Sequence, residues 1–179
     1  NRGVYGSVPT MDACTPDAYQ WAYWNGMEKQ IGDGSNTPSD GGLTVDRWTA
    51  CYQIINRANY FLANIDKVTL SAESKATYVG EVHFLRGVAY ALLAETYGGV
   101  PIFSSILSVD EARQLSRATT QETWDQAIAE YDTAIANLKV VAPQVGRATK
   151  GAALGLEMRA YLYQNNYPEV LKTVQRIED

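Results

Sequence analysis

Residues 154–177, LGLEMRAYLYQNNYPEVLKTVQRI, contain two apolar helical patterns on either side of a short polar turn. Leu154, Met158 and Leu162 lie four residues apart, so they share one face of a first helix. Pro168 suits the first turn of a second helix, because its missing N–H would have no partner there. The stretch therefore predicts an antiparallel pair of helices, the arrangement of one tetratricopeptide unit.

The apolar periodicity continues upstream of this stretch and predicts further helices. The expected helices cover residues 45–66, 72–97, 120–138 and 150–165, with a fifth beginning near Pro168. The expected N-cap residues are Thr44 or Asp46, Ser71, Thr119 and Thr149, and Thr119 with Glu122 has the spacing of a capping box. This pattern is typical of an all-α protein in which tetratricopeptide-like antiparallel helix pairs stack into an α-α superhelix.

Gly87 lies inside the helix expected over 72–97. A glycine in a helix interior costs about 1 kcal/mol relative to alanine, so its presence there needs a packing reason. We therefore expect another helix to cross closely at this residue.

Two segments depart from the helical pattern. Residues 1–44 are rich in glycine and proline and predict irregular loops, with at most a short helix between Ala18 and Gln30. Residues 98–118 form a connection that exceeds the roughly 12–15 residues usual for a loop in a compact domain. Connections of that length are usually functional or disordered.

Composition argues against several classes of protein. The net charge is −5 and no run of Lys and Arg occurs, which argues against nucleic-acid binding. The apolar stretches are far shorter than the roughly 20 residues that span a bilayer. With one His and two Cys, the chain has too few ligands for a typical zinc site. The loop at 33–40 lacks the glycine at position six and the glutamate at position twelve that an EF-hand calcium loop requires. No cofactor is expected. Cys14 and Cys51 are compatible with a disulfide or with two free thiols.

The helical part of the chain also carries an ordered set of motifs. They are WxxxYxIIxRANxFLxNI (48–65), GEVHFLRG (80–87), YALL (90–93), YGGVPI (97–102), RAT (117–119) and GRATKGAA (146–153). In this order and spacing they resemble the N-terminal part of the SusD/RagB family of bacterial surface glycan-binding lipoproteins. Gly87 departs from the family pattern, which has Ala at that position.

The resemblance implies a lipid-anchored protein of the outer membrane that binds a nutrient glycan without catalysis. It implies a TonB-dependent SusC-like transporter as the partner that receives the glycan, and a lipid anchor upstream of Asn1. It also implies that residues 1–179 are the N-terminal helical region of a larger protein. In that case, apolar surface is expected near Val170, Val174 and Ile177.

The densest group of aromatic and polar side chains lies at 19–25, ahead of the first long helix. Tyr and Trp rings can stack on the apolar C–H faces of sugars, while amide side chains bind hydroxyl groups. The preferred ligand-binding residues are Trp21, Tyr23, Trp24, Asn25 and Asn36. The resemblance supports this region, because loops ahead of the 48–65 helix supply part of the family's binding surface, but it assigns no individual roles. Core packing of Trp21 and Trp24 is the alternative.

Other conspicuous side chains are expected to be structural. Trp48, Tyr52, Trp124 and Tyr131 have helical spacing and aliphatic neighbours, which favours core packing. Arg86 and Arg147 are expected to hold helix ends or carbonyl groups. His83 is not expected to be catalytic, because Glu81, two residues away, would not face it on a helix.

Two other functions remain open on the residues alone. A tetratricopeptide-type scaffold for protein interaction would need basic residues along a groove to hold a peptide carboxylate, and no such set is evident. A glycoside hydrolase would need two carboxyl groups about 5–10 Å apart across a cleft, whereas the acidic residues here are scattered over helix surfaces.

Overall fold

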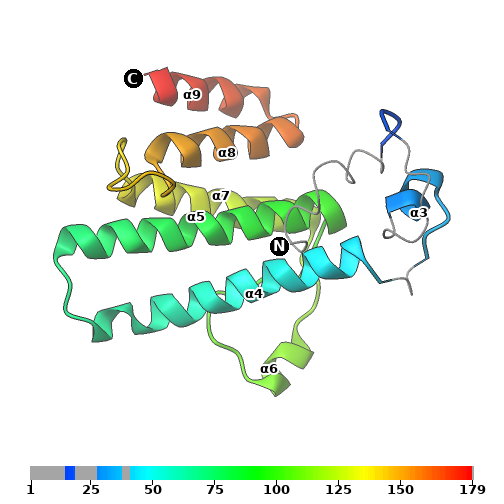
Figure 1. Cartoon of the computed structure of the whole chain (residues 1–179), viewed down its shortest axis with the longest axis horizontal. Coiled ribbons are helices and arrows are strands. Elements are labelled where there is room, and N and C mark those ends of the chain that lie inside the picture. Colours follow the sequence, from blue (N-terminus) through cyan, green and yellow to red (C-terminus); the bar gives the residue numbers. More distant parts are fainter. Residues whose placement is uncertain (1–14, 19–27, 38–40, 179) are drawn as a thin grey trace. The chain divides into compact units, whose positions relative to one another are not determined.

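The computed structural model describes residues 15–18, 28–37 and 41–178, and their regular structure is helical throughout. The helices are α3 (Glu28–Asp33), α4 (Leu43–Asn64), the 3₁₀ turn η2 (Ile65–Lys67), α5 (Ala72–Tyr97), α6 (Val109–Gln114), α7 (Thr120–Asn137), α8 (Lys150–Tyr163) and α9 (Tyr167–Glu178). Figure 1 shows their order along the chain. The predicted all-α class is therefore confirmed.

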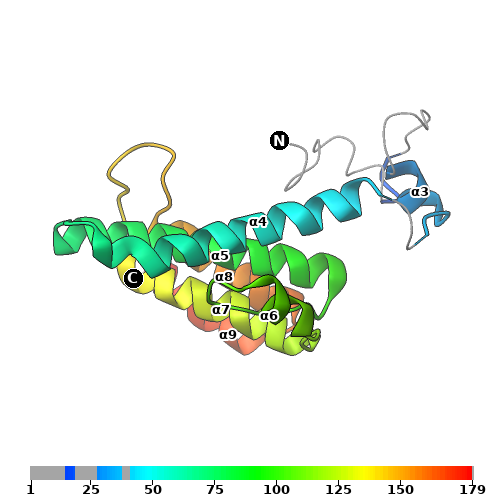
Figure 2. The same ribbon diagram turned by 90° about the horizontal axis from the view of Figure 1, so that it is seen from below.

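The chain divides into two compact units, Asn1–Gln53 and Ile54–Asp179. Helix α4 begins in the first unit and ends in the second. In the second unit, α5 packs on α7, α7 on α8, and α8 on α9, so the helices stack in the order of the sequence (Figures 1 and 2). Successive helices of this stack run antiparallel, as the tetratricopeptide-like pattern predicts.

The core of the second unit is built from large side chains seated against small ones. Tyr90, Leu93 and Tyr131 are fully buried, and Trp124 is 7% exposed. Alanines fill the spaces between them, which lets α5, α7 and α8 approach one another. The predicted core role of Trp124 and Tyr131 is confirmed, whereas Trp48 and Tyr52 are only partly buried.

Gly87 lies where α5 and α7 cross, as its place in the helix predicts. A Cβ atom added there would lie 2.8 Å from Cε1 of Tyr131 and 3.2 Å from Cβ of Glu130. Real Cβ contacts are not this short, so only a glycine permits the observed separation of the two helices at this point.

Most of the predicted helix caps are confirmed. Ser71 accepts a hydrogen bond from the Ser74 N–H, Thr149 accepts one from Ala152, and Thr119 forms its capping box with Glu122. The predicted cap of α4 at Thr44 or Asp46 is wrong. Helix α4 begins earlier, because the Gly42 carbonyl already accepts the N–H of Asp46 at 2.8 Å. Gly42 has φ of 80°, which turns the chain directly ahead of the helix.

The connection at 98–118 contains α6 and is closed at its base. The Ala118 N–H donates to the Val100 carbonyl at 3.1 Å. The Arg117 guanidinium donates to the carbonyls of Gly99 and Tyr97, at 2.7 and 2.8 Å. These hydrogen bonds hold the two ends of the 98–118 connection together, and α6 lies between them.

Candidate functional site

Four of the five predicted ligand-binding residues, Trp21, Tyr23, Trp24 and Asn25, lie outside the described residues. The fifth, Asn36, is exposed and follows α3. Its N–H donates to the Gln30 carbonyl at 3.2 Å, and the Ser35 N–H donates to the same oxygen at 2.9 Å. These bonds fold the chain back over the end of α3 and leave the Asn36 side chain at the surface.

A buried polar network joins α4, α5 and α7 in the second unit. Arg86 donates to Oδ1 of Asn59 at 2.6 Å and pairs with Oε1 of Glu130 at 2.8 Å. The other Glu130 oxygen lies 2.7 Å from Nδ1 of His83. Burial alone would raise the pKa of Glu130, but the hydrogen bonds from His83 and Arg86 outweigh it and hold that pKa below its ordinary value. Glu130 is therefore an ionised partner of two basic side chains.

The same network fastens the connection that follows α5. Asn59 donates from Nδ2 to the carbonyl of Ser105 at 3.0 Å. The Tyr90 hydroxyl donates to the Phe103 carbonyl at 2.9 Å and accepts the Phe103 N–H at 3.1 Å. The network thus satisfies backbone groups of Phe103 and Ser105, which lie in the part of the connection ahead of α6 and belong to no helix. Its role is positional.

Arg86 and Arg147 are structural, as expected, although their partners are side chains. Arg147 donates both Nε and Nη2 to the Glu81 carboxylate, at 2.6 and 2.5 Å. Glu81 is therefore turned away from His83, which is consistent with their spacing on a helix. Sequence reasoning missed these partners because each comes from an element distant in the chain.

A second charged cluster lies where α7, α8 and α9 meet. Glu157 is completely buried, and its Oε2 accepts hydrogen bonds from Nη1 of Arg176 at 2.8 Å and from Oγ1 of Thr173 at 3.4 Å. Burial, followed by the neighbouring Asp132 carboxyl group, raises the pKa of Glu157 to about 7. This cluster holds α9 against α8.

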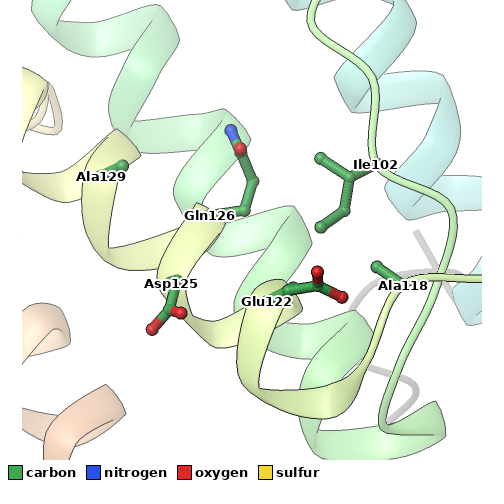
Figure 3. Close-up of a pocket in the computed structure, with 6 residues that line it drawn as sticks. All are labelled: Ile102, Ala118, Glu122, Asp125, Gln126 and Ala129. Carbon is green, nitrogen blue, oxygen red and sulfur yellow. The ribbon is translucent and has the colours of Figure 1, made fainter.

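A shallow hollow of about 490 Å³ lies between α7 and the 98–118 connection. Figure 3 shows Ile102 and Ala118 of the connection facing Glu122 and Gln126 of α7. The polar groups of this hollow are already engaged: Glu122 accepts from Thr119, and Gln126 donates to Glu130 at 2.6 Å. Among the described residues that line it, none has an aromatic ring on which a sugar could stack.

A second hollow, of about 460 Å³, has aromatic walls. Ala94, Glu95, Trp124 and Tyr163 line it. The half-exposed Tyr163 ring meets Trp124 edge-on, with centroids 6.2 Å apart. The Arg159 guanidinium lies 5.2 Å from the Tyr163 centroid and 3.3 Å from Glu95. An exposed ring beside charged hydrogen-bonding groups suits a polar ligand with an apolar face. Sequence reasoning did not single out this group, because three helices contribute to it.

Within the described ranges, no group of three or more His, Cys, Asp or Glu side chains is placed to hold a metal ion. Cys51 is a buried free thiol, and burial raises its pKa to about 11 despite the nearby Arg47. The Cys51 thiol is therefore protonated at neutral pH and a poor nucleophile. Cys14 lies outside the described residues. None of the described helices is long and apolar enough to cross a membrane.

Comparison with known proteins gives concordant matches. A family model of SusD-like proteins, described as "Starch-binding associating with outer membrane", matches residues 4–162. A SusD-like protein of Formosa agariphila is 27% identical over 135 residues, which are 74% of this chain and 26% of that protein. The chain thus spans about a quarter of the length of this curated relative.

Two solved structures from Bacteroides fragilis also match the chain. A SusD-like carbohydrate-binding protein from Bacteroides fragilis is 25% identical with a TM-score of 0.86, covering 99% of this chain and 35% of that one. A SusD-like protein from the same species is 30% identical with a TM-score of 0.71, covering 74% of this chain and 26% of that one. In both cases this chain corresponds to only part of the solved protein, which is longer.

Proposed function

Because the chain belongs to the SusD-like family, a family of non-catalytic glycan-binding proteins, we propose that it captures a nutrient glycan and delivers it to a TonB-dependent SusC-like transporter. The observation that carries the proposal is the match over 99% of the chain to a carbohydrate-binding protein of Bacteroides fragilis. The ligand is an oligosaccharide or polysaccharide. The protein acts on it by binding alone.

The proposed ligand platform consists of Trp21, Tyr23, Trp24, Asn25 and Asn36. Aromatic rings stack on the apolar face of a sugar, and amide groups hydrogen-bond its hydroxyls, so the two residue types together suit a glycan. The exposure of Asn36 supports its part, because a side chain held at the surface of a turn can reach a ligand without rearrangement.

The proposed location is the outer surface of the outer membrane. The family description, which associates these proteins with the outer membrane, supports it. We infer that a lipid attached upstream of Asn1 is the anchor, and that residues 1–179 form the N-terminal helical region of a larger protein. Exposed apolar residues on α9 support the second inference, since Leu171 is 70% exposed and Ile177 is 45% exposed.

The proposal is tested by retention of the full-length protein in native gels that contain polysaccharide. Soluble starch, which the family description names, is the first probe, and other polysaccharides follow. Trp21→Ala and Trp24→Ala are expected to abolish retention. Tyr60→Ala is the matched control, because Tyr60 is an aromatic residue that is 64% exposed on α4 and is not among the proposed ligand-binding residues.

Two results would contradict the proposal. Retention equal to wild type in both tryptophan variants would refute the site. Release of reducing ends from a bound polysaccharide during long incubation would refute binding without catalysis. Loss of retention in Tyr163→Ala alone would instead assign the ligand to the hollow lined by Trp124 and Tyr163.

A further inference from the structure

Helix α9 is attached to the stack by few buried side chains. Figure 1 shows it at the outer end of the stack of the second unit, next to α8. Over the described length of α9, the buried residue is Thr173, at 1% exposure. A segment with little buried surface has low local stability, so the polar contacts between α9 and the rest of the stack contribute much of its attachment.

These polar contacts meet at Glu157 of α8, which is completely buried. Its Oε2 accepts a hydrogen bond from Nη1 of Arg176 at 2.8 Å. The Thr173 hydroxyl lies 3.4 Å from the same oxygen and donates at the shorter distance of 2.9 Å to the Glu169 carbonyl. The other oxygen, Oε1, is buried and has no hydrogen-bond partner in the described part of the chain. A buried carboxylate that is satisfied at one oxygen alone is costly to ionise.

A second carboxyl group competes for the same guanidinium. Oδ1 of Asp132 on α7 lies 4.0 Å from Nη2 of Arg176. Two carboxylates that share one cation are difficult to ionise together, and the more deeply buried one keeps its proton. Because the Asp132 side chain is 57% exposed and Glu157 is buried, the proton belongs on Glu157.

The other charged and titratable groups near this cluster are already neutral or paired. They are Tyr161 and Arg159 of α8, Glu95 of α5, and Glu169 and Lys172 of α9. Burial raises the pKa of the tyrosine to about 12, so its hydroxyl is uncharged at neutral pH. Each glutamate pairs with one of the two cations, Glu95 with Arg159 and Glu169 with Lys172. Arg159 is two residues from Glu157 and therefore lies on another face of α8.

Additional chain would not relieve the buried carboxyl group. The solved relatives are longer than this chain, so further residues of the same protein could lie over α9. They would cover the side chains of Arg176 and Asp132, which are 44% and 57% exposed. They would not reach Glu157, because the helices of this stack already enclose it completely. The unsatisfied oxygen is therefore a property of α7, α8 and α9 themselves.

We propose that Glu157, Asp132 and Arg176 form a proton-operated latch that holds α9 on α8. With a proton on Glu157, the charges of Asp132 and Arg176 balance, and α9 stays docked. When Glu157 gives its proton to water, the cluster carries a net negative charge on a buried and half-satisfied group. Helix α9 then moves away from α8, and water reaches the carboxylate.

The direction of the pH dependence follows from the pKa of Glu157. With α9 docked, burial and the neighbouring Asp132 raise this pKa from 4.5 to about 7. Release of α9 exposes the carboxyl group and returns its pKa to the ordinary value. Docking is therefore strongest below pH 4.5, weakens as the pH rises from 4.5 to 7, and is weakest above that range.

The test is amide hydrogen exchange in the full-length protein, followed by mass spectrometry between pH 5 and pH 8. Rates are corrected for the pH dependence of intrinsic exchange, and peptides from α9 are compared with peptides from α5. Glu157→Gln is neutral at every pH, and Asp132→Asn removes the competing carboxylate. Glu178→Gln is the matched control, because Glu178 is an exposed carboxyl residue at the end of the same helix.

In wild type, the protection of α9 should fall by at least about tenfold from pH 5 to pH 8 and lie below that of α5 at pH 8. In Glu157→Gln, the protection of α9 should be the same at every pH. In Asp132→Asn, the fall should occur at lower pH, because Arg176 then serves Glu157 alone. Glu178→Gln should follow wild type.

Four results would overturn the latch. They are constant protection of α9 in wild type, a fall in Glu157→Gln equal to that of wild type, an unshifted fall in Asp132→Asn, and equal protection of α9 and α5 at pH 8. The last would show that α9 opens only when the whole stack unfolds. If Glu157→Gln fails to fold, the shift expected for Asp132→Asn decides.

Discussion

Substitution of Gly87 by alanine should destabilise the protein, although the same substitution stabilises most helices. The added Cβ would lie 2.8 and 2.9 Å from Cε1 and Cδ1 of Tyr131. The Tyr131 ring is 1% exposed, so it has little room to move aside. Helices α5 and α7 would therefore have to separate at the point where they cross.

Two opposing effects set the size of this change. Alanine in a helix interior is favoured over glycine by about 1 kcal/mol. Forcing an extra methyl group into a packed core costs typically about 1–3 kcal/mol. The net expectation for Gly87→Ala is a loss of about 1 kcal/mol in the free energy of unfolding, with an upper bound of about 2 kcal/mol.

Gly155 supplies the matched control within the same stack of helices. It lies inside α8, and a Cβ atom added there would have no atom within 4 Å outside its own helix and chain neighbours. Gly155→Ala should therefore gain up to about 1 kcal/mol without a packing cost. Urea unfolding followed by circular dichroism measures both variants against wild type. If Gly87→Ala stabilises the protein as much as Gly155→Ala does, the close crossing of α5 and α7 is wrong.

Three further predictions concern polar groups. The pKa of Glu157 is raised to about 7 from an ordinary value near 4.5, so its stabilising contribution is complete below pH 4.5 and is lost as the pH rises through 7. Glu157→Gln should therefore flatten the dependence of unfolding free energy on pH between 4.5 and 8, and equal pH slopes in urea unfolding would contradict this. Thr119→Ala removes the cap of α7 and should cost about 1 kcal/mol in the same measurement, so an unchanged midpoint would argue against the capping box. Asn59→Ala removes the hydrogen bonds to the carbonyls of Phe103 and Ser105 and should speed amide hydrogen exchange around them, whereas exchange equal to wild type would show that the network does not hold this segment.

The helices themselves were predictable because their signals are local. The sequence predicts a helix over 72–97, and α5 spans Ala72–Tyr97. Both bounds were predictable because the N-cap Ser71 and the C-cap Gly98 directly adjoin the helix. The crossing at Gly87 was predictable for a different reason. A glycine inside a helix costs stability, and a helix packed too closely for a Cβ atom explains why glycine occupies this position. The start of α4 was missed because Gly42 turns the chain ahead of the Thr and Asp that resemble caps.

The polar networks were not predictable from the sequence, because nothing local identifies their members. Glu130 lies on the α7 face that packs against α5, and only the fold shows that Arg86 and His83 meet it there. Of the predicted ligand-binding residues, Asn36 is described and is exposed. The aromatic members of that group lie outside the described residues, so their role as a platform stays a prediction.

The closed base of the 98–118 connection has a practical consequence for labelling the protein. Because Arg117 and Ala118 tie the end of this connection to its start at Gly99 and Val100, the length of chain between them does not set the positions of α5 and α7. Each doubling of a flexible loop costs only about 0.6 kcal/mol in closure entropy. A short epitope or a dye-binding peptide inserted between Val109 and Gln114 would therefore report on the protein in living cells while the helix stack keeps its geometry.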